Sequence, residues 1–110
     1  MVASDERLRQ WNQTEQFLLK AKTLLPSAAQ VASTEDLALV DKFLQNNELG
    51  LAADWLGSIV REFDVTSVES MKFIALAEAS MGRLQKQAAL DALLSKLMGS
   101  AYETVLRSAA

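Results

Sequence analysis

The sequence predicts an all-α fold: a compact, single-domain bundle of about five helices joined by short loops. Half of the 110 residues are apolar, and the chain contains only one proline and four glycines. Alanine, leucine, glutamate, glutamine and lysine, which favour helix over strand, are abundant. A chain of this length can bury a core without disulfides or metal ions, so we expect residues 1–110 to fold as one domain.

The first helix is predicted over about residues 5–25. Ser4, followed by Asp5 and Glu6, is typical of a helix start, and Pro26 ends the segment. Apolar residues recur along it at helical spacing and are expected to face the core: Leu8, Trp11, Phe17, Leu18, Ala21, Leu24 and Leu25. Residues 27–33 have no clear periodicity, which leaves them open between a loop and one loose turn.

A second helix is predicted from Ser33 or Thr34 to Gln45. Ser33 and Asp36 approximate a capping box, in which two side chains three residues apart satisfy the first backbone N–H groups of a helix. The residues expected to face inward are Leu37, Val40 and Leu44, with Leu39 and Phe43 widening the apolar stripe.

The three polar residues 46–48 interrupt the apolar pattern and predict a tight turn. Asn46 is expected to end the preceding helix in the left-handed conformation, and Asn47 to cap the next one. Glu48 is then expected in the first helical turn, where the helix dipole favours a carboxylate by about 0.3–1 kcal/mol. The two flanking helices therefore form a helical hairpin.

The third helix is predicted over about residues 48–63. Its residues at core spacing are Leu49, Ala52, Leu56, Ile59, Val60 and Phe63, and Trp55 is also expected to pack. The more exposed positions are expected to be Asp54, Ser58, Arg61 and Glu62. Gly50 and Gly57 lie seven residues apart on one face, so we expect a neighbouring backbone to approach the helix there.

The fourth helix is predicted over residues 67–81. Thr66 and Glu69 match the S/T-x-x-E capping box, and Gly82 is expected to close the helix. Its apolar face is predicted to comprise Val68, Met71, Ile74, Ala75 and Leu76.

A fifth helix is predicted to end at Gly99, with a short frayed helix restarting at Ser100. Its apolar residues are Leu84, Ala88, Leu90, Leu93, Leu94, Leu97 and Met98. The sequence leaves open whether the fourth and fifth helices are continuous through Gly82.

Composition disfavours most kinds of catalysis. The chain has no cysteine and no histidine, so it lacks disulfides, thiolate metal sites and the commonest general base. No cofactor motif or paired-carboxylate metal motif occurs, and we expect no enzyme activity, no catalytic residue, no cofactor and no metal. The charged start does not resemble a secretory signal, and no apolar run approaches about 20 residues. We therefore expect a cytoplasmic protein without membrane contact.

Acidic residues are concentrated in the middle of the chain. Residues 34–82 carry three basic and nine acidic side chains, a net charge of −6, whereas residues 1–33 carry +1 and residues 83–110 carry +2. A negative surface repels nucleic acid and attracts basic protein surfaces, although an ordinary solvated helix face would show the same pattern. The candidate contact residues for a protein partner are Asp41, Glu48, Asp54, Glu62 and Asp64.

One pattern spans residues 34–82, the predicted core hairpin unit that precedes a C-terminal extension over residues 83–110. A helix leads to a polar turn with Glu48, then Gly50, Ala52 and Leu56, and a capped helix ends near Met81 and Gly82. This pattern resembles the Maf-type immunity proteins and related small helical immunity proteins of bacterial polymorphic toxin systems. The resemblance implies a protein that binds a cognate toxin C-terminal domain, often a nuclease, and blocks it.

The chain departs from that pattern in two places, and a second functional class remains open. It continues for about two helices past Gly82, and it has Ala53, Asp54 and Trp55 where a plainer Leu or Glu pair is expected. The alternative to an inhibitor that uses an acidic helical face is a non-catalytic adaptor or self-associating bundle. In that case, the apolar residues 90–98 would pair with another copy, giving a homodimer through the C-terminal helices.

Overall fold

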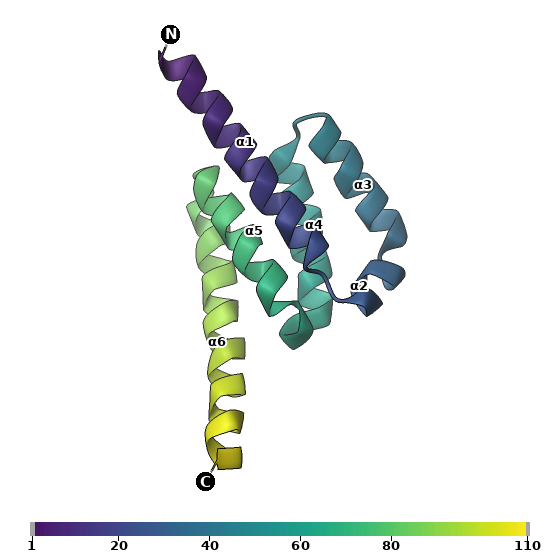
Figure 1. Ribbon diagram of the computed structural model, residues 1–110, viewed down its shortest axis with the longest axis vertical. Helices are drawn as coiled ribbons and strands as arrows, with labels where there is room; N and C mark the ends of the chain where they lie inside the picture. The colour runs from purple at the N-terminus through teal and green to yellow at the C-terminus, as the bar shows by residue number, and fades with distance from the viewer. Residues whose placement is uncertain (1, 110) are drawn as a thin grey trace.

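The computed structural model describes the backbone of residues 2–109 and the side chains of residues 6–63 and 66–99. Within this backbone the chain forms six α-helices and one 3₁₀ turn, with no strand, which confirms the all-α prediction (Figure 1). The elements are α1 (Val2–Thr23), α2 (Ser27–Ala32), α3 (Thr34–Gln45), α4 (Leu49–Phe63), η1 (Asp64–Ser67), α5 (Val68–Ser80) and α6 (Leu84–Ala109).

Two helical hairpins, the long helix α1 and the short helix α2 make up the bundle. The pairs α3–α4 and α5–α6 form the hairpins, and α1 packs against α5 and, less extensively, against α4 (Figure 1). The radius of gyration is 15.2 Å, above the roughly 13 Å expected for a compact domain of this length. Figure 1 shows why: the start of α1 and the end of α6 project from opposite ends of the bundle.

The apolar faces predicted for the hairpin form the centre of the core. The buried residues are Leu37, Val40 and Leu44 of α3, and Leu49, Ala52, Leu56, Ile59 and Val60 of α4. Met71, Ile74 and Ala75 of α5 complete this cluster, and Leu18, Ala21 and Leu25 join it from the N-terminal segment. Full burial of one such aliphatic side chain contributes about 1.5–3 kcal/mol, so this cluster accounts for most of the attraction between the helices.

The predicted burial of Leu8 and Trp11 is wrong, because α1 is longer than its neighbours. These side chains are 53% and 52% exposed. Helix α1 has 22 residues and α5 has 13, which correspond to about 33 Å and 20 Å. The first turns of α1 therefore extend past the helix that would cover them, although their spacing is correct for a core face.

Buried hydroxyl groups hold α1 against α5. Thr14 Oγ1 donates a hydrogen bond to Gln10 O at 2.8 Å and lies 2.6 Å from Ser80 Oγ. At the other end of the contact, Ser70 Oγ donates to Ala21 O at 2.7 Å. These pairs, 14 with 80 and 21 with 70, fix an antiparallel register for the two helices.

The turn between α3 and α4 closes in a Schellman motif. Asn47 donates its backbone N–H to Leu44 O and Glu48 donates to Phe43 O, at 3.2 and 2.8 Å. The left-handed residue is Asn47, with φ of 58°, whereas Asn46 ends α3 with φ of −93°. The predicted left-handed Asn46 is thus wrong by one residue. Glu48 also precedes α4 instead of lying in its first turn, and its carbonyl accepts from Ala52 N at 3.1 Å.

The turn at Gly82 has the same form and separates α5 from α6. Gly82 has φ of +73°, and the N–H groups of Gly82 and Arg83 donate to Ala79 O and Glu78 O at 3.0 and 2.9 Å. The two helices are therefore not continuous.

Both predicted capping boxes are wrong. Ser33 makes no side-chain cap and instead links two helices through its backbone. The residues before it, which showed no periodicity, form the short helix α2, and α3 follows directly. Thr66 Oγ1 donates backwards to Phe63 O at 2.6 Å, and Glu69 pairs with Lys72 at 3.0 Å.

Helix α6 does not end at Gly99 as predicted, but continues to Ala109. One glycine in a long helix costs about 1 kcal/mol relative to alanine, too little to break it. The predicted apolar face of α6 is confirmed only in part, since Leu90 and Leu94 are buried but Leu84 is 68% exposed. None of the helices in the described part of the chain is long and apolar enough to cross a membrane.

Candidate functional site

The five predicted contact carboxylates do not form one surface. Asp41 faces α1, where Lys22 Nζ donates to its Oδ1 at 2.5 Å. Asp54 faces the start of α6. Glu48 and Glu62 are exposed near opposite ends of α4. Asp64 belongs to η1, and its side chain lies outside the described residues.

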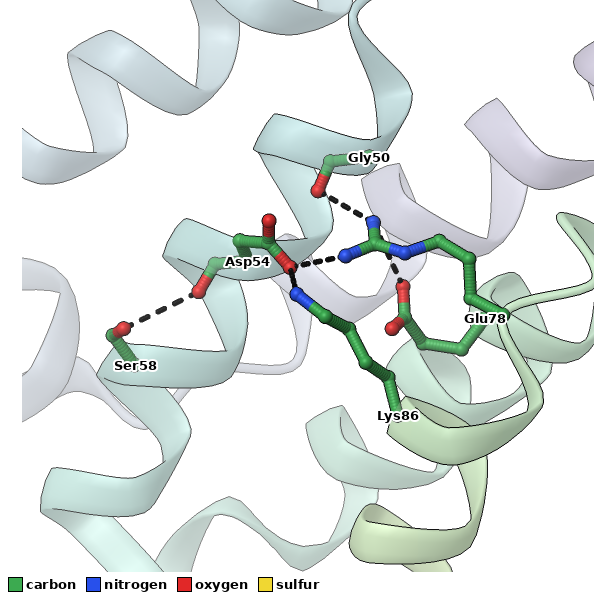
Figure 2. A network of polar contacts seen from close by, with 6 residues as sticks. Gly50, Asp54, Ser58, Glu78 and Lys86 are labelled. Atoms are coloured by element: carbon green, nitrogen blue, oxygen red, sulfur yellow. Dashed lines mark hydrogen bonds and ion pairs between the residues drawn. The ribbon is translucent and has the colours of Figure 1, made fainter.

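Asp54 is the centre of an ion network that joins α4 to the α5–α6 turn (Figure 2). Arg83 Nη2 donates to Asp54 Oδ1 at 2.5 Å, and Lys86 Nζ donates to the same oxygen. Arg83 Nη1 donates to Gly50 O at 2.8 Å. Asp54 was predicted as an exposed contact residue for a partner, but this one carboxylate binds two cations of the opposite hairpin.

Gly50 makes room for this network. A Cβ at this position would lie 2.8 Å from Arg83 Nη1, and one at Gly57 would lie 3.2 Å from Arg61 Nη1. The predicted close approach of a neighbouring backbone is wrong at both glycines, since what lies over them is a guanidinium group. At Gly50 the missing side chain lets Arg83 reach the helix backbone.

Glu78 of α5 is a buried carboxylate beside the same arginine, Arg83. It is 2% exposed, and its Oε1 lies 3.4 Å from Arg83 Nη1 and has no hydrogen-bond partner. Figure 2 shows its carboxylate on α5 directed toward Arg83 and α4. The strong hydrogen bonds of Arg83 go to Asp54 and Gly50, so Glu78 receives only an ionic contact.

The pKa values of the two carboxyl groups in this network are shifted in opposite directions. Burial raises the pKa of Glu78 above its ordinary value, and the attraction of Arg83 opposes this effect without cancelling it. Partial burial also acts to raise the pKa of Asp54, but hydrogen bonds from Lys86 and Arg83 outweigh it and hold that pKa below its ordinary value. Asp54 is thus the stable anion of the network.

A cavity of about 340 Å³ lies beside the network, between α4, α5 and α6. Its lining residues are Ala53, Asp54, Gly57, Ser58, Arg61, Ile74, Glu78, Gln85, Lys86, Ala89 and Leu90. The anions among them are paired with cations of the same network, which is the arrangement of a structural clip between helices. Among the described residues no group of three or more acidic side chains could hold a metal ion.

The other flank of α4 carries an apolar strip with free carboxylates. Leu51 is 46% exposed and Leu39 of α3 is 37% exposed. Trp55 and Phe43 are half-buried and pack against the core, so the prediction that Trp55 packs is confirmed in part. Glu48 and Glu62 form no ion pair within the described residues. This flank therefore presents both apolar side chains and carboxylates to solvent.

Sequence reasoning missed Glu78, Arg83 and Lys86, and only Glu78 left a signal. Met71, Ala75 and Glu78 follow the i, i+4, i+7 spacing of a buried face, which places a carboxylate in the core and implies a cation nearby. The partner itself could not be read from the sequence, because Asp54 and Arg83 are 29 residues apart and meet only in the folded bundle.

Comparisons with protein-family models, curated proteins and solved structures find no match to this chain. The resemblance to immunity proteins therefore depends on the residues of the 34–82 segment alone.

Proposed function

We propose that this chain is an immunity protein, which binds the C-terminal domain of a cognate bacterial toxin and neutralises it by direct contact. The observation that carries the proposal is the flank of the α3–α4 hairpin that exposes Leu39 and Leu51 together with Glu48 and Glu62, two carboxylates that form no ion pair within the described residues. Such an inhibitor needs no catalytic residue or cofactor. It needs a rigid surface that fits the toxin.

The hairpin supplies the rigidity that this role requires. Its turn is closed by two backbone hydrogen bonds, and its inner face belongs to the central core. A toxin that cleaves nucleic acid must have a basic surface for phosphate groups, and fixed carboxylates can occupy that surface while long-range attraction speeds association. The net charge of −6 over residues 34–82 agrees with a basic partner.

Co-expression tests the proposal. An immunity gene is expected directly downstream of the gene for its toxin, so the probe is the C-terminal domain of the protein encoded upstream of this chain, produced in a bacterial host with and without the chain. We expect toxicity that the chain relieves, followed by co-purification of a stable complex. The control is Leu56→Asp, which disrupts the core and should not rescue growth. Toxicity that persists in the presence of the folded chain would contradict the proposal.

A self-associating or adaptor bundle is the second candidate. This candidate is favoured by α6, whose C-terminal part projects beyond α5 (Figure 1). The side chains of Met98 and of Leu84, the first residue of α6, are 46% and 68% exposed. A homodimer through the C-terminal helices would give twice the chain mass in light scattering at micromolar concentration, and dissociation on dilution would accompany loss of helicity. A stable monomer would leave the inhibitor as the better account.

A further inference from the structure

The orientations of α4 and α3 in the bundle determine which residues of the hairpin can contact a toxin. At 3.6 residues per turn, Gly50 and Gly57 lie about 100–120° to one side of Leu56, and Trp55, Glu62 and Leu51 lie about 100–140° to the other. Arg83 is held at Gly50 and Asp54, so the first flank faces the α5–α6 turn. The second flank points away from it.

The orientation of α3 is fixed in the same way. Asp41 lies about 100° to one side of the buried Val40, and Phe43 and Leu39 lie about 60° and 100° to the other. Asp41 binds Lys22 of α1, so this flank of α3 faces α1. Exposed Leu39 and half-buried Phe43 consequently lie on the side of α3 away from Asp41, where we place Leu51 and Trp55 of α4 next to them. We call the surface formed by Leu39, Phe43, Glu48, Leu51, Trp55 and Glu62 the outer hairpin face.

Resting on the proposed function, we infer that the outer hairpin face is the toxin-binding surface and that its occupant is a basic protein surface with an apolar depression. Leu51 and Trp55 would fill the depression, since a half-buried aromatic ring held by a core is a rigid anchor. Glu48 and Glu62 would flank the anchor and meet cations of the partner. Asp41 and Asp54 are excluded from this contact, because their charges are paired inside the chain.

Charge decides between the classes of occupant. Three exposed carboxylates of the hairpin, Glu35, Glu48 and Glu62, form no ion pair within the described residues, and Lys42 is the cation on the exposed side of α3. An anionic lipid surface or a nucleic acid would be repelled. A second copy of the chain would bring the same carboxylates against themselves, which opposes an isologous pair through this face.

A pair of matched double variants tests the inference. The test variant is Leu51→Arg with Glu62→Lys on the outer hairpin face. The control variant is Leu76→Arg with Asp91→Lys on α5 and α6, where Leu76 is 47% exposed, close to the 46% of Leu51, and Asp91 is exposed like Glu62. The two variants change the net charge equally, so long-range attraction falls to a similar extent. A difference between them reports the local contact.

Titration calorimetry with the C-terminal domain used in the co-expression test provides the readout. We expect the dissociation constant to rise at least about 30-fold for the test variant and to change less than about 3-fold for the control, with equal helicity for both. Affinity of the native chain should also fall more steeply with salt than that of the test variant.

The possible failures are distinguishable. If the native chain binds and both variants bind equally well, the contact lies elsewhere and the inference is overturned while the proposed function stands. If the test substitutions abolish dimerisation instead of toxin binding, the occupant is a second copy and the inference is overturned. If the native chain neither binds nor rescues, the proposed function fails and this inference fails with it.

Discussion

The two flanks of α4 both carry a carboxylate, but only one of these groups has an ion-pair partner among the described residues. Asp54 binds Arg83 of the α5–α6 turn and Lys86 of α6, whereas Glu62 is exposed on the flank of α4 that also carries Trp55 and Leu51. The residue type and the helix are the same. The position of neighbouring cations therefore separates a structural acid from one available for binding, and this distinction can be tested by substitution.

The largest effect is expected at Leu56, the fully buried residue between the two flanks. Leu56→Asp should reduce the free energy of unfolding by about 4 kcal/mol or more, because it leaves an unpaired charge in the core. Leu51→Asp, on the exposed strip of the same helix, should change it by less than about 1 kcal/mol. Denaturant unfolding followed by circular dichroism measures both. Full retention of stability in Leu56→Asp would mean that the register of α4 is wrong.

The next effect compares the carboxylates directly. Asp54→Lys places a third cation beside Arg83 and Lys86 and should cost about 1–2 kcal/mol, a range reduced for solvent screening because this side chain is 38% exposed. Glu62→Lys should change stability by less than about 0.5 kcal/mol. Urea midpoints at low and high salt measure the difference, which should shrink with salt. Equal costs would remove the distinction between the two flanks.

Both results bear on how far the sequence predicts this molecule. The helices of the hairpin and their buried faces were predictable, because amphipathic spacing is local. The caps at Ser33 and Thr66 were not, because a short helical segment directly precedes each helix and the Thr66 hydroxyl donates back to Phe63 O. The exposure of Trp11 depends on the relative lengths of α1 and α5, and the pairing of Asp54 depends on an approach between distant segments. Such features need the assembled bundle.

The pH dependence of stability tests the ion network around Asp54, through the buried carboxyl group of Glu78. A carboxyl group whose pKa is raised by folding is protonated more readily in the folded state than in the unfolded state. The native chain should therefore lose stability from this group as pH rises from about 4 through the raised pKa, and the loss should be complete above it. Glu78→Gln has no titrating group there and should lack this step.

The measurement is the urea midpoint of both chains between pH 4 and 8. The stability of Glu78→Gln relative to the native chain should increase with pH and then become constant, whatever constant offset the lost contact with Arg83 adds. Asp54 acts in the opposite direction and at lower pH, because its folded pKa is depressed, and both chains share that contribution. Parallel curves over the whole range would show that burial does not perturb Glu78.

The smallest effect compares the two glycines of α4. Gly57→Ala should stabilise the chain by up to about 1 kcal/mol through helix propensity, because the neighbouring Arg61 is exposed and can move away. Gly50→Ala should gain nothing or lose stability, since its Cβ would meet a guanidinium that Asp54 and the Gly50 carbonyl hold in place. In an Arg83→Met background this penalty should disappear, so the double-mutant cycle isolates the contact. If Arg83→Met leaves the stability change caused by Gly50→Ala unaltered, the contact of Arg83 with α4 does not depend on this glycine.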